Sequence, residues 1–189
     1  MTGGGIVNVP HVRIAPWGEG DLGLLRSVNT PQMKRHVGGP ETDEQVIDRH
    51  QRYLDIAATG RGRMFSIIAL PEFEAVGTIG YWERLWQEET VYEVGWNVLP
   101  LFQGRGIAAA AAAAAVDAAR GEQKWRYLHA FPGVDNLASN AICRKVGFSF
   151  IAECDFEYPP GSFMRSNNWS LDLTGVEAGA GSDRGTGIA

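Results

Sequence analysis

A glycine-punctuated loop runs directly into eight consecutive alanines, and this junction carries the clearest chemical signal in the chain. The stretch from Trp96 to Arg120 reads WNVLPLFQGRGIAAAAAAAAVDAAR. The first amides of a helix have no intrahelical partner, and the helix dipole places partial positive charge at the same end. Gly104 and Gly106 remove side-chain shielding, so a ligand can approach the backbone closely. The junction therefore predicts an anion site, most naturally for a phosphate or pyrophosphate.

Two familiar nucleotide-binding motifs do not fit this junction. A P-loop needs Gly-Lys-Ser/Thr after its second glycine, whereas Ile107 and Ala108 follow Gly106 here. A dinucleotide fingerprint needs a third glycine after a parallel βαβ unit, whereas Ala109 stands there and the preceding strands favour an antiparallel hairpin. The phosphate ligand is therefore of another kind.

Three segments together resemble one enzyme family. Residues 98–108, VLPLFQGRGIA, resemble the acyl-CoA signature of GNAT acetyltransferases, with Gln103, Gly106 and Ala108 at its fixed positions. Residues 136–148, NLASNAICRKVGF, resemble the next helix of the family, and YEVGW at 92–96 resembles the RimJ/RimL-like branch. The resemblance implies an acyl-CoA-dependent N-acetyltransferase, of a branch that acetylates amino groups of ribosomal-protein N-termini or of small molecules.

The resemblance also implies how acetyl-CoA is held as the co-substrate. Its pyrophosphate lies on the amides of residues 103–108, and its pantetheine arm runs between strand 90–99 and strand 126–131. Arg105 either adds charge to a phosphate or is a solvated loop residue. The implied CoA-binding residues are Trp96, Val98, Gln103, Gly104, Arg105, Gly106, Ile107, Ala108, Asn136, which bonds an amide of the arm, and Ser139, which lies near the sulfur.

Acetyl transfer to an amine requires removal of a proton, polarisation of the thioester carbonyl and protonation of the leaving thiolate. We expect Glu93 to be the general base through a bound water; the alternative is an outward cross-strand partner. Backbone amides near residues 96–98 are expected to serve the oxyanion. Many family members have a tyrosine acid where Cys143 stands, so Ser139, a water molecule or Cys143 are the alternatives. A helix cysteine in this position is more often a buried small hydrophobe.

The acceptor is predicted to be an amine. Trp82 and Trp86 alternate along one strand near Trp96, and they form either cross-strand packing or an aromatic wall for the amine. Our first expectation is a small-molecule primary amine. A peptide N-terminus is the alternative, and a non-catalytic CoA-binding regulatory module is a third.

The hydrophobic pattern predicts one mixed α/β domain over residues 9–173, with disordered ends at 1–8 and 174–189. Thr42 and Gln45 have capping-box spacing, and Gly60 ends the helix that they open. Val46, Ile47, Tyr53 and Leu54 are expected to face inward from that helix. The expected strands are 11–15, 64–70, 75–86, 90–99, 126–131, 148–156 and 168–173; the expected helices are 21–28, 42–58, the alanine run and 136–146. The family resemblance adds a mostly antiparallel, twisted sheet of about seven strands, splayed between the fourth and fifth, with about four flanking helices.

Composition narrows the classes of partner and cellular location that remain. A formal net charge of −5 and a pI near 5.4 argue against a nucleic-acid or membrane-surface partner. Two cysteines are too few for a disulfide scaffold, and nothing at the start resembles a signal peptide. The apolar run 107–116 is shorter than the ~20 residues of a membrane span. Four histidines lack ligand spacing, so we expect no metal. A cytoplasmic enzyme is predicted, and relatives suggest a possible homodimer.

Overall fold

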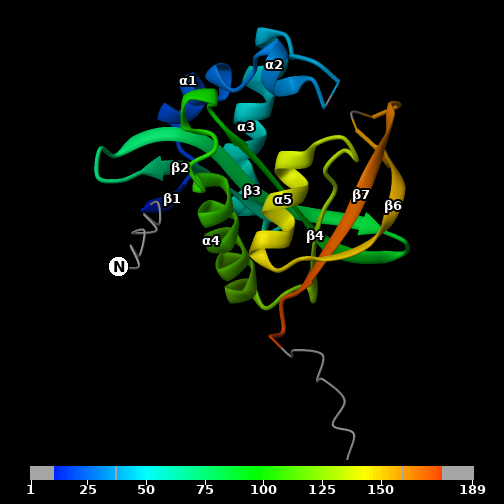
Figure 1. Cartoon of the computed structure of the whole chain (residues 1–189). Coiled ribbons are helices and arrows are strands. Elements are labelled where there is room, and N and C mark those ends of the chain that lie inside the picture. The colour runs from blue at the N-terminus through cyan, green and yellow to red at the C-terminus, as the bar shows by residue number, and fades with distance from the viewer. Residues whose placement is uncertain (1–10, 37, 159, 176–189) are drawn as a thin grey trace, which may run out of the picture.

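A seven-stranded sheet lies between two layers of helices (Figure 1). The computed structural model describes residues 11–36, 38–158 and 160–175. The strands are β1 (Val12–Pro16), β2 (Gly62–Ala69), β3 (Glu74–Trp86), β4 (Glu89–Val98), β5 (Tyr127–Ala130), β6 (Ser149–Glu157) and β7 (Phe163–Asp172). The helices are α1 (Leu22–Ser27), α2 (Pro31–Lys34), α3 (Asp43–Thr59), α4 (Ile107–Glu122) and α5 (Leu137–Val146), with single 3₁₀ turns at Glu19–Asp21 and Pro100–Phe102.

The sheet order is β1-β2-β3-β4-β5-β7-β6, and the only parallel neighbours in it are β4 and β5. These two strands pair only at Tyr92 with Leu128 and at Glu93 with His129. Beyond Glu93, β4 continues to Val98 paired with β3 alone. The predicted mixed α/β fold, its seven strands and the divergence of the fourth and fifth strands are therefore confirmed.

The two helical layers cover opposite faces of the sheet, as Figure 1 shows. On one face α4 and α5 pack over the central strands, where Tyr81, Tyr92 and Leu128 are fully buried. On the other face a smaller cluster joins α1 and α3 to Trp17 and Met64. Within the described part of the chain, no helix is both long and apolar enough to cross a membrane.

The alanine run lets α4 lie close against the sheet. Its buried residues are Ile107, Ala109, Ala111, Ala112, Ala115, Val116 and Ala119, so all but two side chains on this face are single methyl groups. Alanine is also the strongest helix former, which favours order in a segment with so little side-chain variety. The small contact face fixes the start of α4 firmly beside β4.

The helix α3 forms as its local signals predict, with one exception. Thr42 Oγ1 accepts from the Gln45 backbone amide, and Gln45 Oε1 accepts from the Thr42 amide, which completes the capping box. Gly60 ends the helix in the left-handed conformation, with φ of 65°. The predicted inward orientation of Ile47 is wrong, because its side chain is 45% exposed.

Other boundaries differ from prediction for physical reasons. Five α-helices are present instead of about four, because the four-residue α2 is too short to show a helical period. The strand β7 begins at Phe163 instead of residue 168, since its polar stretch pairs with β6 through the sheet ladder. The β3–β4 hairpin, in contrast, turns between the predicted strands as expected, with positive φ at Gln87 and Glu88. The predicted disordered segment 1–8 lies outside the described residues, as do residues 176–189 of the second segment.

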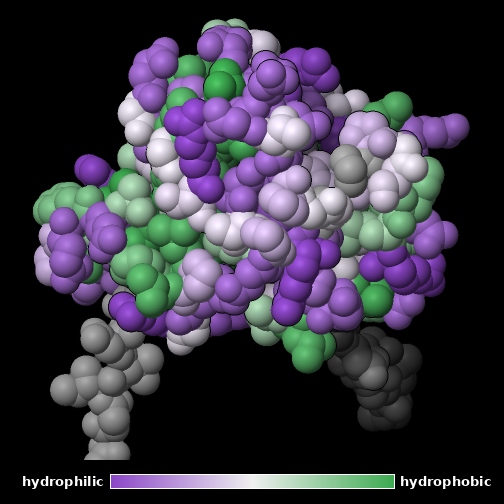
Figure 2. Space-filling view, turned by 90° about the horizontal axis from the view of Figure 1, so that it is seen from above, coloured by the Kyte–Doolittle hydropathy of each residue, from purple (hydrophilic) through white to green (hydrophobic). Residues whose placement is uncertain are grey.

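Hydrophilic residues cover much of the face in Figure 2, and hydrophobic residues are exposed there in smaller groups. The exposed large hydrophobic residues come from several separate elements of the fold, among them Phe73, Leu85, Leu101 and Phe163. Scattered apolar side chains of this kind are normal on a folded domain. These exposed apolar side chains therefore need no functional explanation.

Because α4 packs closely against the sheet, a larger side chain should destabilise the fold at a buried position of this helix but not at an exposed one. Ala111 is fully buried, whereas Ala113 is exposed on the same helix. Ala111→Leu should lower the free energy of unfolding by about 1–3 kcal/mol through overpacking. Ala113→Leu should change it by less than about 0.5 kcal/mol, as exposed substitutions usually do. Urea unfolding of both variants measures the difference, and equal midpoints would show that α4 is not tightly seated.

Candidate functional site

The glycine loop forms an open anion cradle at the start of α4. Gly104 and Gly106 have φ of 73° and 77°, left-handed values that glycine adopts without strain. Gly106 is the N-cap residue, and no side chain caps the helix there. A cavity of about 450 Å³ lies beside this start, with Gln103, Gly104, Gly106, Ile107 and Ala108 in its wall. No side chain among the described residues competes with an anion for the first amides of α4, and the anion site itself stays a prediction.

Two loop side chains have local roles. Gln103 Nε2 donates a 2.8 Å hydrogen bond to the backbone carbonyl of Val98, which ties the loop to the end of β4. The Arg105 guanidinium lies 5.4 Å from the centre of the Phe102 ring and does not line the cavity. In contrast, Arg35 and Lys145 do line it, and they are cations that sequence reasoning did not single out.

A second cavity of about 840 Å³ lies beside the first, between α3, β4 and the end of β6. Both cavities share a junction, which we define by the residues that line both: His36, Trp96, Asn97, Asn136 and Ser139. The junction lies where β4 has left β5 and has a free edge. Two ligands, one in each cavity, would therefore meet at the divergence of these strands.

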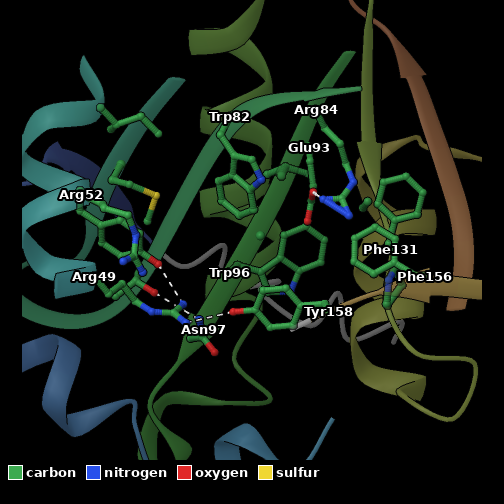
Figure 3. A pocket seen from close by; sticks show the side chains of 18 of the residues that line it. Arg49, Arg52, Trp82, Arg84, Glu93, Trp96, Asn97, Phe131, Phe156 and Tyr158 are labelled. Carbon is green, nitrogen blue, oxygen red and sulfur yellow. Dashed lines mark hydrogen bonds and ion pairs between the residues drawn. The ribbon is translucent and has the colours of Figure 1, made fainter. Parts of the chain in front are cut away.

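Glu93 lines the larger cavity from β4, directly opposite Trp82 of β3 (Figure 3). The residue is 9% exposed, and burial raises the pKa of its carboxyl group above the ordinary value. Arg84 opposes this shift, because its Nη1 lies 3.0 Å from Glu93 Oε2. That approach falls outside hydrogen-bond geometry, and Oε2 has no hydrogen-bond partner among the described residues. Glu93 therefore has a buried oxygen able to accept a proton.

Aromatic rings hold the groups around Glu93. Gly95 allows the Trp82 indole to lie over β4, since a Cβ at Gly95 would come within 2.9 Å of the ring. The Arg84 guanidinium lies 4.2 Å from the centre of the Phe156 ring, a cation–π arrangement. Trp86 lies elsewhere: it packs against Phe131 at 4.6 Å between ring centres and lines neither cavity. Of the two predicted substrate-binding tryptophans, the structure brings only Trp82 to the cavity.

The start of α5 brings Asn136 and Ser139 to the junction. Asn136 Oδ1 accepts from the Ser139 backbone amide and so caps the helix, which leaves the Ser139 hydroxyl at the cavity wall. Cys143 lies one turn further along and is fully buried in the core. It lines neither cavity, and burial raises the pKa of its thiol to about 12. Cys143 thus lies outside both cavities, whereas Glu93 and Ser139 line the larger one, in agreement with the alternative of a buried small hydrophobe.

The remaining wall of the larger cavity contains functional groups that sequence reasoning missed. His36 lies at the junction, where its Nδ1 is 3.3 Å from Asp135 Oδ1. Lys34, Arg49 and Tyr158 line the side formed by α2, α3 and the segment after β6. No spacing along the chain connects these residues, so only the fold shows that they share a wall. Among the described residues, no group of three or more His, Cys, Asp or Glu side chains could hold a metal ion.

A mixed sheet with a diverging parallel pair, an uncapped helix start and two meeting cavities defines a two-substrate transferase domain. Residues 11–149 match the family model described as "Acetyltransferase (GNAT) domain", and the chain belongs to this family. The family prediction from the sequence is confirmed, and with it the prediction of an acetyltransferase.

Solved structures share this fold at low sequence identity. RimL, a ribosomal L7/L12 alpha-N-protein acetyltransferase in complex with coenzyme A, superposes with a TM-score of 0.71 at 18% identity, over 85% of this chain and 93% of that chain. Spermidine N-acetyltransferase from Vibrio cholerae, in complex with CoA and spermine, gives 0.70 at 12% identity, over 86% and 96%. An aminoglycoside acetyltransferase in complex with coenzyme A gives 0.69 at 20% identity, over 86% and 95%. No curated protein matches the sequence.

The surroundings of Glu93 predict a measurable titration. Burial should raise the pKa of Glu93 above the ordinary value of about 4.3. Arg84→Met removes the cation that favours the charged carboxylate but keeps an apolar side chain against Phe156. The pKa should therefore rise further in this variant, and carbon NMR of labelled glutamate side chains can follow both titrations. Arg165→Met, which removes an exposed cation on β7, is the control and should leave Glu93 unchanged; an unshifted Glu93 in the Arg84 variant would contradict the pairing.

Proposed function

We propose that this chain is an N-acetyltransferase that moves the acetyl group of acetyl-CoA to the primary amine of a small molecule. The observation that carries the proposal is the junction of the two cavities beside Glu93. One cavity has the anion cradle that the donor requires, and the other has a buried carboxylate that the acceptor requires. Both substrates would be bound at once, so transfer would be direct.

The donor side fits CoA through backbone groups. The diphosphate would lie on the amides at the start of α4, next to Gly106. The pantetheine arm would extend along the free edge of β4, near Trp96 and Val98, as an added strand would. Asn136 would donate to the arm from its Nδ2, because its Oδ1 already accepts a hydrogen bond from the Ser139 amide. Arg35 and Lys145, which line this cavity, would supply positive charge for the phosphate groups.

The reaction follows from the groups at the junction. One proton of the acceptor ammonium passes through water to Glu93, whose raised pKa makes it a stronger base. The amine nitrogen then attacks the thioester carbonyl carbon, and backbone amides near Trp96 stabilise the oxyanion. As the C–S bond breaks, the second proton passes from nitrogen to the leaving sulfur through Ser139 or water. The products are the N-acetyl amine and CoA, and Glu93 returns its proton to solvent.

The size and lining of the larger cavity support a small acceptor. Its volume of about 840 Å³ lies within the range of about 300–1,000 Å³ typical of small-molecule sites. Trp82 and Trp96 give it apolar walls, while Glu93 gives it a proton acceptor. A peptide N-terminus is the alternative acceptor, because RimL shares the fold. A non-catalytic CoA-binding module is the third possibility and predicts no turnover at all.

A thiol-release assay distinguishes these three functions. Acetyl-CoA is offered with small primary amines in one arm and with N-terminal peptides in the other, and mass spectrometry identifies the acetylated product. Saturable turnover of small amines supports the proposal. Turnover confined to peptides would replace it with the alternative, and CoA binding without any product would indicate the regulatory module.

The assignment of Glu93 predicts a large loss of activity on neutralising its side chain. Glu93→Gln keeps the shape of the residue but removes the base, so kcat should fall by about 100-fold or more. Glu89→Gln, an exposed change on the same strand, should keep full activity. In the unchanged protein, kcat/KM should fall as the pH decreases through the raised pKa of Glu93, because the base becomes protonated. Unchanged kcat in Glu93→Gln for every acceptor would remove the base assignment.

The cradle predicts a specific weakening of CoA binding. In Gly106→Ala a Cβ opposes the left-handed conformation by roughly 1–2 kcal/mol, so the free loop relaxes and binding must restore it. CoA should therefore bind about 5- to 30-fold more weakly, which calorimetric titration measures. Gly121→Ala lies in α4, far from the loop in sequence and without close contacts, and is the matched control. Equal affinities for the two variants would place the diphosphate elsewhere.

The cytoplasmic location and the possible homodimer stay predictions. A reduced compartment agrees with the two free cysteines, Cys143 and Cys154. Size-exclusion chromatography with light scattering would determine the oligomeric state.

A further inference from the structure

The larger cavity contains a buried positive charge without a counter-charge of its own. Lys34, at the end of α2, is 5% exposed and lines this cavity. Within residues 11–36, 38–158 and 160–175, its side chain forms no ion pair and no hydrogen bond. Its Nζ is not one of the fully buried, unpartnered side-chain atoms of this described part of the chain, so the ammonium group keeps access to the cavity while the rest of the side chain is buried. A charged group in so poorly solvated a place is costly without a partner, so this placement requires an explanation.

The carboxylate whose charge favours protonated Lys34 is Glu41, and it is already engaged by a second cation. Glu41 Oε1 accepts from Arg49 Nη2 at 2.6 Å and from Arg49 Nε at 3.1 Å. Arg49 also donates to the hydroxyl groups of Tyr53 and Tyr158, at 3.3 and 3.0 Å. The buried Lys34 and the partly buried Arg49 therefore share one carboxylate. We call Lys34, Glu41, Arg49 and Tyr158 the α2–α3 cluster, and it carries one surplus positive charge.

The pKa of Lys34 agrees with a surplus positive charge in the cluster. The pKa of Lys34 is lowered to about 8, chiefly by burial and also by the charge of Arg49, while Glu41 opposes both effects. Lys34 is therefore still largely protonated near neutral pH, but its charged form is poorly stabilised. An anion placed in the cavity would stabilise that form.

Elsewhere in the same wall, two cations lie beside carboxylates. Arg61, an exposed residue, pairs with Glu83 at 3.3 Å, and Arg84 pairs with Glu93 at 3.0 Å. Glu83 also pairs with Lys124, which lies outside the cavity lining. Arg52 and Asp55, which have opposite charges, are both exposed at the edge. Among the described residues that line the cavity, Lys34 is therefore the buried cation without an ion pair. Figure 3 shows Arg49 and Arg52 on one side of the cavity and Glu93 with Arg84 on the other, with Trp82 and Trp96 between them.

We propose that the acceptor is a zwitterion, an amine that also bears a carboxylate, and that the α2–α3 cluster binds the carboxylate while the amine faces Glu93. This inference rests on the proposed function and names its substrate class. A single surplus positive charge matches a monoanion better than a phosphate dianion. Lys34 and the Tyr158 hydroxyl are the groups able to donate to it, and Trp82 and Trp96 contact the chain between its two ends. A polyamine would instead place a second cation against Lys34 and Arg49.

The test compares linear ω-amino acids of increasing length with their uncharged carboxamides, under thiol-release conditions near neutral pH. Diamines and aminoalkyl phosphonates of matching length are the other arms. At the best chain length, kcat/KM for the carboxylate should exceed that for the carboxamide by about 10-fold or more, because charge-assisted hydrogen bonds are the stronger kind. A phosphonate preferred over every carboxylate, or a preferred diamine, would overturn the proposal.

Two variants test which residues cause the preference for a carboxylate over a carboxamide. Lys34→Met should bring the carboxylate-to-carboxamide ratio close to one while the carboxamide is still turned over. Glu41→Gln, which removes the competing carboxylate, should increase that ratio. Arg120→Met removes the same charge as Lys34→Met but on an exposed part of α4, and it should leave the ratio unchanged. Comparison of ratios between variants cancels the different basicities of the amines. An unchanged ratio in a folded Lys34→Met protein would contradict the assignment.

Binding measured without turnover separates this inference from the proposed function. Calorimetry in the presence of CoA gives the affinity of each carboxylate and of its carboxamide. Lys34-dependent binding of the carboxylate without acetylation would retain the anion site and overturn the proposed function. Acetylation of carboxylate and carboxamide with equal efficiency would retain the function and overturn the anion site.

Discussion

The short pairing between β4 and β5 is the constraint on which the rest of the site depends. The two strands are neighbours at only two residue pairs and then diverge, so the last part of β4 has a free edge inside the molecule. Buried backbone groups need hydrogen-bond partners, and an extended ligand can supply them. The uncapped start of α4 is fixed beside the same edge by the Gln103–Val98 hydrogen bond and by the small alanine side chains. The divergence of β4 and β5, the uncapped start of α4 and the junction of the two cavities therefore lie at one place in the fold.

Charge burial is the second organising principle of the site. Glu93 and Lys34 are both largely buried, and in each case burial disfavours the charged form, so the pKa of the carboxyl group rises and that of the ammonium group falls. The charge of Glu93 is favoured by an imperfectly aligned ion pair with Arg84 and by Trp82, while Lys34 shares Glu41 with Arg49. These incompletely compensated groups, of opposite charge, lie in the wall of the same cavity. Perturbed, buried ionisable groups of this kind are characteristic of sites that bind or transform a ligand.

Sequence reasoning succeeded where the signal was local. Gly104 and Gly106, the capping box at Thr42 and the order of the strands each depend on residues close together in the chain, and the structure has them as predicted. The wall opposite Glu93 is different, because Lys34 and Tyr158 come from segments more than a hundred residues apart. Along the sequence, such residues look like those of any solvated surface. The helix that carries Lys34 is a single turn, and its hydrophobic period cannot be read.

This contrast explains how one fold can accept different amines. The proposed donor side uses contiguous backbone, namely the free edge of β4 and the glycine loop. The proposed acceptor side combines Trp82, Glu93 and Trp96 of the sheet with side chains of α2, α3 and the segment between β6 and β7, which lie outside the sheet. The spermidine and aminoglycoside acetyltransferases share the architecture at 12% and 20% identity, so the architecture cannot itself specify the acceptor. Under the proposed function, charge in the α2–α3 wall would then discriminate between acceptors, because a like charge placed in a poorly solvated cavity is repelled more strongly than in water.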